Sequence, residues 1–259
     1  MKKLYCIILF LTLTLWAHSQ IPTNNYILTR TMCDSLGVAT IDQIQYYDGL
    51  GRPYLAVLKG AAGGNRHLAS LQEYDTQGRN KCIWLPVCIE QEYNNSYDLK
   101  KKLLETYQDS LAYTSYDYHT LPLDRVTWES GPGKAWVGKG IKNDYFFNIA
   151  SPDSVLSCKK YSVTDGGGRL LYDGYYKANS LSVVCNTDED GYRSYTFKDS
   201  EGRVLLVRSC DGNVFSDTYF VYDSFGRLCY VLPPSYQENE DLDLWAYQYS
   251  YDGLGRCIK

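Results

Sequence analysis

The sequence is poor in the side chains that most often perform catalysis or bind metals. Only two of its three histidines, His67 and His119, follow Gln20, and none of its nine cysteines belongs to a Cys-x-x-Cys pair. No Gly-Lys-Ser or Gly-Lys-Thr sequence is present to end a phosphate-binding loop. A Cys-His nucleophile pair, such as Cys88 with His119, has no supporting motif, and the acidic run Gln237–Asp243 lacks the alternating oxygens of a calcium loop. We therefore predict a protein that is not an enzyme and has no cofactor or metal.

Excess positive charge and long apolar segments are also missing. The formal net charge is −4, which disfavours a nucleic-acid partner. The one long apolar run, Leu4 to Trp16, follows two lysines and precedes small residues up to Ser19. This is the pattern of a cleaved export signal, and the run is shorter than the ~20 residues of a membrane span. We predict a signal peptide at residues 1–19 and a secreted or cell-surface protein without a membrane span after cleavage; a membrane anchor is the alternative.

The cysteines do not define a disulfide framework. Eight of them follow the predicted signal peptide, spread along a chain that is long enough to bury a core without covalent cross-links. Export permits disulfides, so bridges and buried thiols are equal alternatives, and the connectivity is open.

Tyrosine, by contrast, is abundant, with 26 residues against 7 phenylalanines. Tyrosine favours strands and has a polar tip, so the surplus indicates β structure with hydrated aromatic faces. Exposed aromatic residues such as Tyr113, Tyr116, Tyr118 and Trp128 could stack on a glycan or a partner protein, although packing on a sheet face is the commoner role.

One motif, Asp-x-x-Gly-Arg, occurs six times. At average residue frequencies a chain of this length would contain roughly 0.05 copies, so chance is excluded. Apolar or alternating residues flank the copies, and a turn repeated between strand patterns is typical of β-hairpins. The copies are Asp48–Arg52, Asp75–Arg79, Asp165–Arg169, Asp199–Arg203, Asp223–Arg227 and Asp252–Arg256.

Each residue of the motif suits a hairpin corner. The Asp carboxylate can accept hydrogen bonds from backbone N–H groups ahead of it, and the glycine can adopt the left-handed conformation that closes the loop. The arginine can bond the Asp four residues earlier or lie over the tyrosine that precedes that Asp; a row of anion-binding arginines is a less favoured alternative. The predicted structural residues are Asp48, Gly51, Arg52, Asp75, Gly78, Arg79, Asp165, Gly168, Arg169, Asp199, Gly202, Arg203, Asp223, Gly226, Arg227, Asp252, Gly255 and Arg256.

The longest interval between copies contains a partial copy and the best helix candidate. The partial copy keeps Tyr116-Asp117 and Asp124-Arg125 but lacks the turn glycine. The segment Tyr97–Tyr107 has apolar residues at helical spacing, with Ser96 as a possible N-cap. The residues therefore predict a mainly β fold of antiparallel hairpin repeats with one short helix.

Tyr-Asp-x-x-Gly-Arg repeats at these spacings resemble the Rhs, or YD-repeat, family of large exported proteins. Four copies begin with Tyr-Asp, whereas those at Thr164-Asp165 and Lys198-Asp199 lack the ring. The region from Tyr46 to Trp136 resembles the uncharacterised N-terminal domain that precedes the repeats in many such bacterial proteins, through the stretches YYDGLGRP, YDTQGRNKCIWLPV and LPLDRVTWESGPGKAW. In the family the repeats wind into a curved or spiral sheet that can close into a hollow shell, and many members carry a C-terminal toxin or effector.

The resemblance implies an N-terminal domain at residues 20–150 with two copies and a YD-repeat segment at 151–259, incomplete at its C-terminal end. The implied function is a non-enzymatic secreted scaffold, the N-terminal part of an Rhs-like shell of the polymorphic-toxin type that encapsulates or displays an effector. The copies are far fewer than in the family, so we interpret the chain as truncated or as a remnant reading frame. Its C-terminal edge is expected to pair with further repeats or another protein chain. The alternative is a cell-surface binding or adhesion module that uses exposed aromatic residues to hold a glycan or a protein.

Overall fold

The computed structural model describes residues 25–36, 38–64, 66–90, 96–120, 123–164, 168–212 and 214–258. The predicted signal peptide lies outside these residues. Within them, no helix has the length and apolar character needed to cross a membrane. The chain divides into two compact units: unit 1 runs to Ser115 and includes Pro132–Ala135, and unit 2 contains Tyr116–Gly131 and Trp136 onward.

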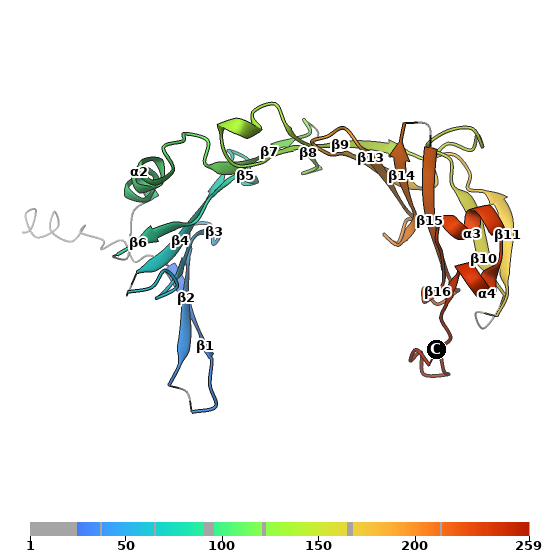
Figure 1. Cartoon of the computed structure of the whole chain (residues 1–259), viewed down its shortest axis with the longest axis horizontal. Helices are drawn as coiled ribbons and strands as arrows, with labels where there is room; N and C mark the ends of the chain where they lie inside the picture. The colour runs from blue at the N-terminus through green and yellow to red at the C-terminus, as the bar shows by residue number, and fades with distance from the viewer. Residues whose placement is uncertain are drawn as a thin grey trace, which may run out of the picture. The chain divides into compact units, whose positions relative to one another are not determined.

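Unit 1 is an antiparallel sheet with the strand order β1-β2-β3-β4-β5-β7, and β6 pairs with β4 (Figure 1). Its strands are β1 (Asn25–Met32), β2 (Thr40–Tyr47), β3 (Pro53–Leu58), β4 (His67–Tyr74), β5 (Asn80–Trp84), β6 (Val87–Ile89) and the first half of β7 (Tyr113–Tyr118).

The core of unit 1 lies on one face of this sheet because apolar residues alternate along its strands. Ile44 and Tyr46 of β2 and Leu55 and Val57 of β3 are buried, while their neighbours in sequence are more exposed. The helix α2 (Ser96–Tyr107) covers the core with two leucines that have no exposed surface, Leu99 and Leu103. The helix expected from the sequence is therefore present.

Unit 2 combines an antiparallel sheet with a smaller two-stranded sheet. The larger sheet has the order β8-β9-β12-β13-β14-β15-β16-β17, and β9 pairs directly with β12. The chain between these two strands forms the small sheet, which packs on the buried face through the ring of Tyr161 against that of Tyr219, 5.1 Å apart. The strands are β8 (Val126–Ser130), β9 (Gly140–Phe147), β10 (Lys159–Val163), β11 (Leu170–Tyr175), β12 (Ser182–Thr187), β13 (Arg193–Lys198), β14 (Val204–Asp211), β15 (Val214–Tyr222), β16 (Leu228–Leu232) and β17 (Tyr247–Gln248).

Unit 2 also contains two short helices that the sequence analysis missed. They are α3 (Pro234–Asn239) and α4 (Leu242–Trp245), so the expectation of a single short helix was wrong. Proline at the first position favours α3, and the carboxylate of Asp241 caps the N-terminus of α4. Tyr236 of α3 is buried in the core of the unit, which holds these helices against the sheet.

Candidate functional site: the corner arginines

The corner between β2 and β3 shows how the motif folds. The Oδ1 atom of Asp48 accepts hydrogen bonds from the backbone N–H groups of Leu50 and Arg52, both at 2.9 Å. Its Oδ2 atom accepts one from Nε of Arg52 at 2.8 Å. The backbone closes the turn, because the N–H of Gly51 donates to the carbonyl of Asp48 at 3.0 Å. One carboxylate thus binds both the turn and the first residue of the return strand.

Four further copies have this geometry. The distance from the arginine Nε to the aspartate Oδ2 is 2.7–2.8 Å in each of them. The glycines of all five corners have φ between 75° and 85°, a region that strains other residues. The four corners are Asp75–Arg79 between β4 and β5, Asp199–Arg203 between β13 and β14, Asp223–Arg227 between β15 and β16, and Asp252–Arg256 after β17.

Hydrogen bonds within the corners lower the pKa of their aspartates. For Asp48 and Asp252 the largest cause is the backbone N–H of the arginine four residues later. For Asp75, Asp199 and Asp223, burial is the largest single influence and raises the pKa. The hydrogen bonds from the arginine and from a second backbone N–H, together with the charge of the arginine, outweigh burial and lower the pKa. The corners are thus built around ionised carboxylates.

The copy at Asp165–Arg169 differs from the expected pattern. Here the turn begins one residue earlier: the N–H of Thr164 donates to the carbonyl of Arg169, and the N–H of Arg169 donates to Oγ1 of Thr164, both at 3.0 Å. The hydroxyl of Thr164 thus accepts the backbone hydrogen bond that an aspartate carboxylate accepts in the other corners. The role predicted for Asp165 in this turn stays a prediction. Asp165 itself lies outside the described residues.

One corner of the same form was missed. Between β12 and β13, Oδ1 of Asp188 accepts from the N–H groups of Asp190 and Tyr192, and the N–H of Gly191, at φ 90°, donates to the carbonyl of Asp188. Tyrosine stands where the other copies have arginine, so a search for Gly-Arg could not find it. The signal Asp-x-x-Gly alone would have identified this turn.

Three corner arginines contact the tyrosine of the next corner rather than the tyrosine before their own aspartate. The guanidinium carbon of Arg52 lies 4.5 Å from the ring centre of Tyr74, the tyrosine that precedes the following copy. The same relation joins Arg203 to Tyr222 at 5.5 Å and Arg227 to Tyr251 at 5.0 Å. Of the two expected contacts, the bond to the aspartate four residues earlier is therefore present, whereas the stacked ring belongs to the next corner and not to the preceding tyrosine. Each of these arginines connects two corners, with its own aspartate at one edge and the next tyrosine on one face.

The glycine of the next corner belongs to the same contact. A Cβ atom on Gly78 would lie 3.0 Å from Nη1 of Arg52, and one on Gly226 would lie 3.2 Å from Nη1 of Arg203. No atom would lie within 4 Å of a Cβ on Gly51 or Gly202. At Gly78 and Gly226 the glycine therefore has two roles. It adopts the left-handed backbone conformation of the turn, and its lack of a side chain leaves space for the guanidinium of the preceding corner.

The partial copy in the longest interval keeps this contact. Arg125 lies over the ring of Tyr145 at 4.8 Å, and the hydroxyl of Tyr145 donates to the carbonyl of Val126 at 2.9 Å. Tyr74 and Tyr251 make the equivalent hydrogen bonds to Pro53 and Leu228, the residues that follow Arg52 and Arg227. The loss of the turn glycine has not removed the contact between arginine and tyrosine.

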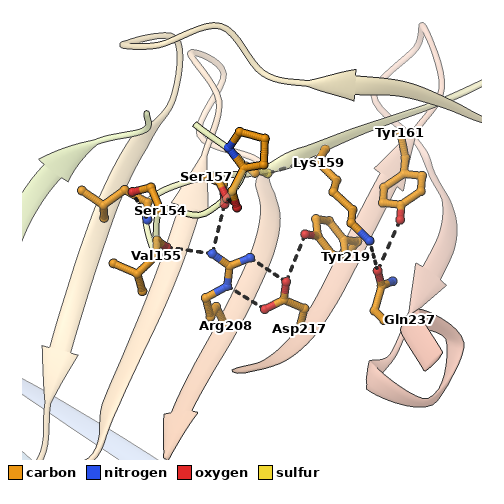
Figure 2. Close-up of polar contacts among 12 residues, drawn as sticks. Ser154, Val155, Ser157, Lys159, Tyr161, Arg208, Asp217, Tyr219 and Gln237 are labelled. Atoms are coloured by element: carbon orange, nitrogen blue, oxygen red, sulfur yellow. Dashed lines mark hydrogen bonds and ion pairs between the residues drawn. The ribbon is translucent and has the colours of Figure 1, made fainter. Parts of the chain in front are cut away.

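A second polar centre lies in the core of unit 2 (Figure 2). Arg208 of β14 is only 6% exposed and forms two hydrogen bonds of 2.7 Å with Asp217 of β15. Its Nη1 atom also donates to the carbonyls of Val155 and Ser157, in the segment that leads into β10. Burial lowers the pKa of Arg208, but the carboxylate outweighs this and the pKa is raised. The charged pair therefore fixes this segment to the sheet.

A neighbouring contact fixes β10 to α3. The side-chain carbonyl of Gln237 accepts from Nζ of Lys159 at 3.2 Å and from the hydroxyl of Tyr161 at 3.3 Å (Figure 2). Burial is the largest cause of the raised pKa of Tyr161. None of these residues was predicted from the sequence, although a charged residue on each of two neighbouring apolar strands was a visible signal.

The other candidates from the sequence lie apart from these contacts. None of the eight described cysteines forms a disulfide. Burial raises the pKa of Cys82 to about 11 and that of Cys158 to about 12, which disfavours the reactive thiolate. His67 accepts a hydrogen bond from the N–H of Gly60. The four aromatic residues proposed to stack on a ligand, Tyr113, Tyr116, Tyr118 and Trp128, are half-buried rather than exposed.

Residues 24–147 match the family model of a domain of unknown function, DUF6443. No curated protein matches the chain. The fold is similar to that of TcdB2-TccC3-Cdc42, with a TM-score of 0.52 and 15% identity over 94% of this chain. It is also similar to TcdB2-TccC3 without its hypervariable C-terminal region, with a TM-score of 0.51 and 16% identity over 96% of this chain. A Tc holotoxin pore from Photorhabdus luminescens matches with a TM-score of 0.52 and 16% identity over 95% of this chain.

The chain spans 12% of the length of each of these solved chains. At this level of identity the comparison shows a shared, mainly β fold.

Proposed function

We propose that the chain is a non-enzymatic, secreted β-repeat scaffold, the N-terminal part of an Rhs-like shell that encloses or displays an effector polypeptide. The contact of a corner arginine with the tyrosine and glycine of the next corner is the observation that supports this most. A wall made of hairpins needs interactions between neighbouring hairpins, and here the motif residues supply them. Repeats that contact mainly their neighbours can extend into a large curved surface.

The similarity to TcdB2-TccC3 supports the scaffold by fold alone. The chain corresponds to a small part of those proteins, so the enclosure of an effector is our proposal for the larger assembly. We favour a protein partner over a glycan, because the aromatic candidates for sugar stacking are half-buried and pack within the sheets. The contact of Trp84 with Tyr113, 4.8 Å between ring centres, is an example of this packing.

Export is part of the proposal. The apolar run and the small residues up to Ser19 predict cleavage before Gln20. Mass spectrometry of the protein from the culture medium should find an N-terminus at or near Gln20. An intact Met1 on protein confined to the cytoplasm would contradict export.

Protease protection tests the enclosure of an effector. The protein is isolated from the medium of the cells that produce it and treated with protease, either in its native form or after denaturation. We expect a second polypeptide segment, distinct from residues 20–259, to survive in the native sample and to be digested in the denatured one. Recovery of this chain alone, with nothing protected, would refute the enclosure. Specific turnover in a hydrolase screen would contradict the non-enzymatic assignment.

A further inference from the structure

The corner between β12 and β13 fixes its turn as the other corners do but has no arginine. Oδ1 of Asp188 accepts hydrogen bonds from the backbone N–H groups of Asp190 and Tyr192, at 3.0 Å and 2.8 Å. In the five corners that end in arginine, Oδ2 of the aspartate accepts a further bond from the arginine Nε at 2.7–2.8 Å. Here Tyr192 stands at the arginine position, and no basic side chain of the described residues pairs with Asp188. The second carboxylate oxygen therefore lacks the guanidinium that the other five have.

This difference arises within the sheet and is a property of the sequence at position 192. Both strands of the corner are paired on each side, because β12 lies between β9 and β13 and β13 lies between β12 and β14. The missing arginine is thus independent of any strand that would follow the last one described.

A cavity of about 500 Å³ lies beside this corner. It is lined by Asp188 and Tyr192 of the corner and by Asp211, at the end of β14. The side chain of Tyr192 is 58% exposed, so its ring is accessible to a ligand. Arg193 also lines the cavity, but its side chain bonds to Tyr195, which is buried in the core of the unit. The cavity therefore combines two carboxylates with an exposed aromatic ring.

A carboxylate and a tyrosine ring are the two groups that hold a guanidinium elsewhere in this chain. Arg52 donates to Asp48 at 2.8 Å, and its guanidinium carbon lies 4.5 Å from the ring centre of Tyr74. Arg203 and Arg227 combine the same two contacts. At the corner between β12 and β13 both kinds of group are present, and the guanidinium is the missing member.

We propose that Asp188 and Tyr192 form a binding site for the guanidinium group of an arginine side chain. The carboxylate pairs with the guanidinium, and the ring covers its flat face. The arginine belongs to a segment other than the described residues, either on a separate polypeptide or in a further part of the same chain, and the chemistry of the site is the same in both cases. This inference does not rest on the scaffold function proposed above.

A nuclear magnetic resonance titration tests the site in the isotope-labelled chain of residues 20–259. The ligand is the peptide acetyl-Gly-Arg-Gly amide, added up to millimolar concentration. The reporters are the backbone N–H groups of Asp190 and Tyr192, because both donate to the carboxylate of Asp188. We expect saturable shifts of both resonances. The backbone N–H of Arg203, whose corner already holds a guanidinium, should not move.

Changes in the ligand separate its charge from its shape. The same peptide with citrulline keeps a planar side chain but has no charge, so it should cause no saturable shift. The peptide with lysine keeps the charge, and it should bind several times more weakly because an ammonium group can neither pair through two parallel N–H groups nor stack as a plane.

Two protein variants give matched controls. Asp188→Asn keeps a side-chain oxygen that can accept the backbone bonds of the turn but removes the charge, so it should abolish binding. Tyr192→Arg restores the Asp-x-x-Gly-Arg motif, so its own guanidinium should take the second oxygen of Asp188 and exclude the peptide. Tyr192→Arg should be at least as stable as the native chain in urea, and unchanged resonances elsewhere in both spectra will show that the variants are folded.

Chemical labelling identifies the source of the arginine. In the protein isolated from the cells that produce it, a carbodiimide should label Asp188 several times more slowly than in residues 20–259 alone. A denaturing gel then distinguishes a second polypeptide from a longer form of this chain. The proposal would be overturned by equal labelling, by no saturable shift with the arginine peptide, by an equal shift with the citrulline peptide, or by undiminished binding to Tyr192→Arg.

Discussion

Two glycines of unit 1 have nearly the same backbone conformation but different surroundings, so alanine substitutions at them separate the two roles of the motif glycine. Gly51 has φ 75° and Gly78 has φ 85°. A Cβ on Gly51 meets no atom within 4 Å, whereas one on Gly78 lies 3.0 Å from Nη1 of Arg52. Both substitutions impose the same conformational strain, and only Gly78→Ala displaces the arginine.

The magnitudes follow from this difference. An alanine in the left-handed region costs about 1–2 kcal/mol, which is the whole expected effect of Gly51→Ala. Gly78→Ala should cost up to about 1 kcal/mol more, because Nη1 of Arg52 must shift by a few tenths of an ångström and its contact with Tyr74, worth ~0.5–2 kcal/mol, is weakened. Arg52 has little freedom to move away, since Asp48 holds its Nε atom at 2.8 Å.

Urea unfolding of the two variants measures both costs in the same unit of the chain. In an Arg52→Ala background the two glycine substitutions should destabilise equally, to within ~0.5 kcal/mol. Equal costs in the native background would refute the reasoning, because they would show that a Cβ at position 78 does not disturb the contact between Arg52 and Tyr74.

Three further predictions concern unit 2. Arg208→Met should lower the free energy of unfolding in urea by about 3–5 kcal/mol, because it leaves Asp217 buried without its partner; a cost below ~1 kcal/mol would show that water replaces the arginine. The pKa of Asp199 is lower in the folded protein than in the unfolded chain, where it is about 3.9. The ionised carboxylate therefore stabilises the fold fully at pH values above about 3.9, and this stabilisation is lost as the pH falls through the pKa of the folded protein. Unfolding in urea at a series of pH values should therefore show a steeper loss of stability in acid for the native chain than for Asp199→Asn, and identical slopes would contradict this. Cys158, buried and with a raised pKa, should resist a thiol reagent at neutral pH until the protein is denatured, whereas the exposed Cys33 should react at once; similar labelling rates would contradict the described burial.

The turns were predictable from the sequence because their interactions are local. The carboxylate of Asp48, the N–H groups that it binds and Gly51 all lie within five residues, Asp48 to Arg52. Side-chain chemistry and backbone preference are sufficient to derive such a turn. In the copy that contains Arg169, the backbone N–H of this arginine donates to the hydroxyl of Thr164, an acceptor that lies outside the five-residue motif.

Contacts between distant residues could not be derived in this way. The partner of Arg52 is Tyr74, and their contact depends on the pairing of β3 with β4. The motif alone suggested the nearer tyrosine, which was wrong. Arg208 and Asp217 lie opposite each other in the β14–β15 register, so their pairing follows once the turn at Asp211–Val214 is known. To predict these contacts from the sequence, one needs to know where each strand begins and ends, and the residue types alone did not show this.

The contact between corners explains why the copies keep their motif while the spacing between them varies. From Arg203 to Tyr222 the chain runs along β14, turns after Asp211 and returns along β15. From Arg227 to Tyr251 the chain also makes the helices α3 and α4 before it returns, yet the arginine still lies 5.0 Å from the ring. The intervening segment can change in length without disturbing the contact, because the contact joins the start of one strand to the end of its neighbour. Such a contact depends on the aspartate, glycine and arginine of one corner together with the tyrosine and glycine of the next, and it does not depend on the length of the segment between them.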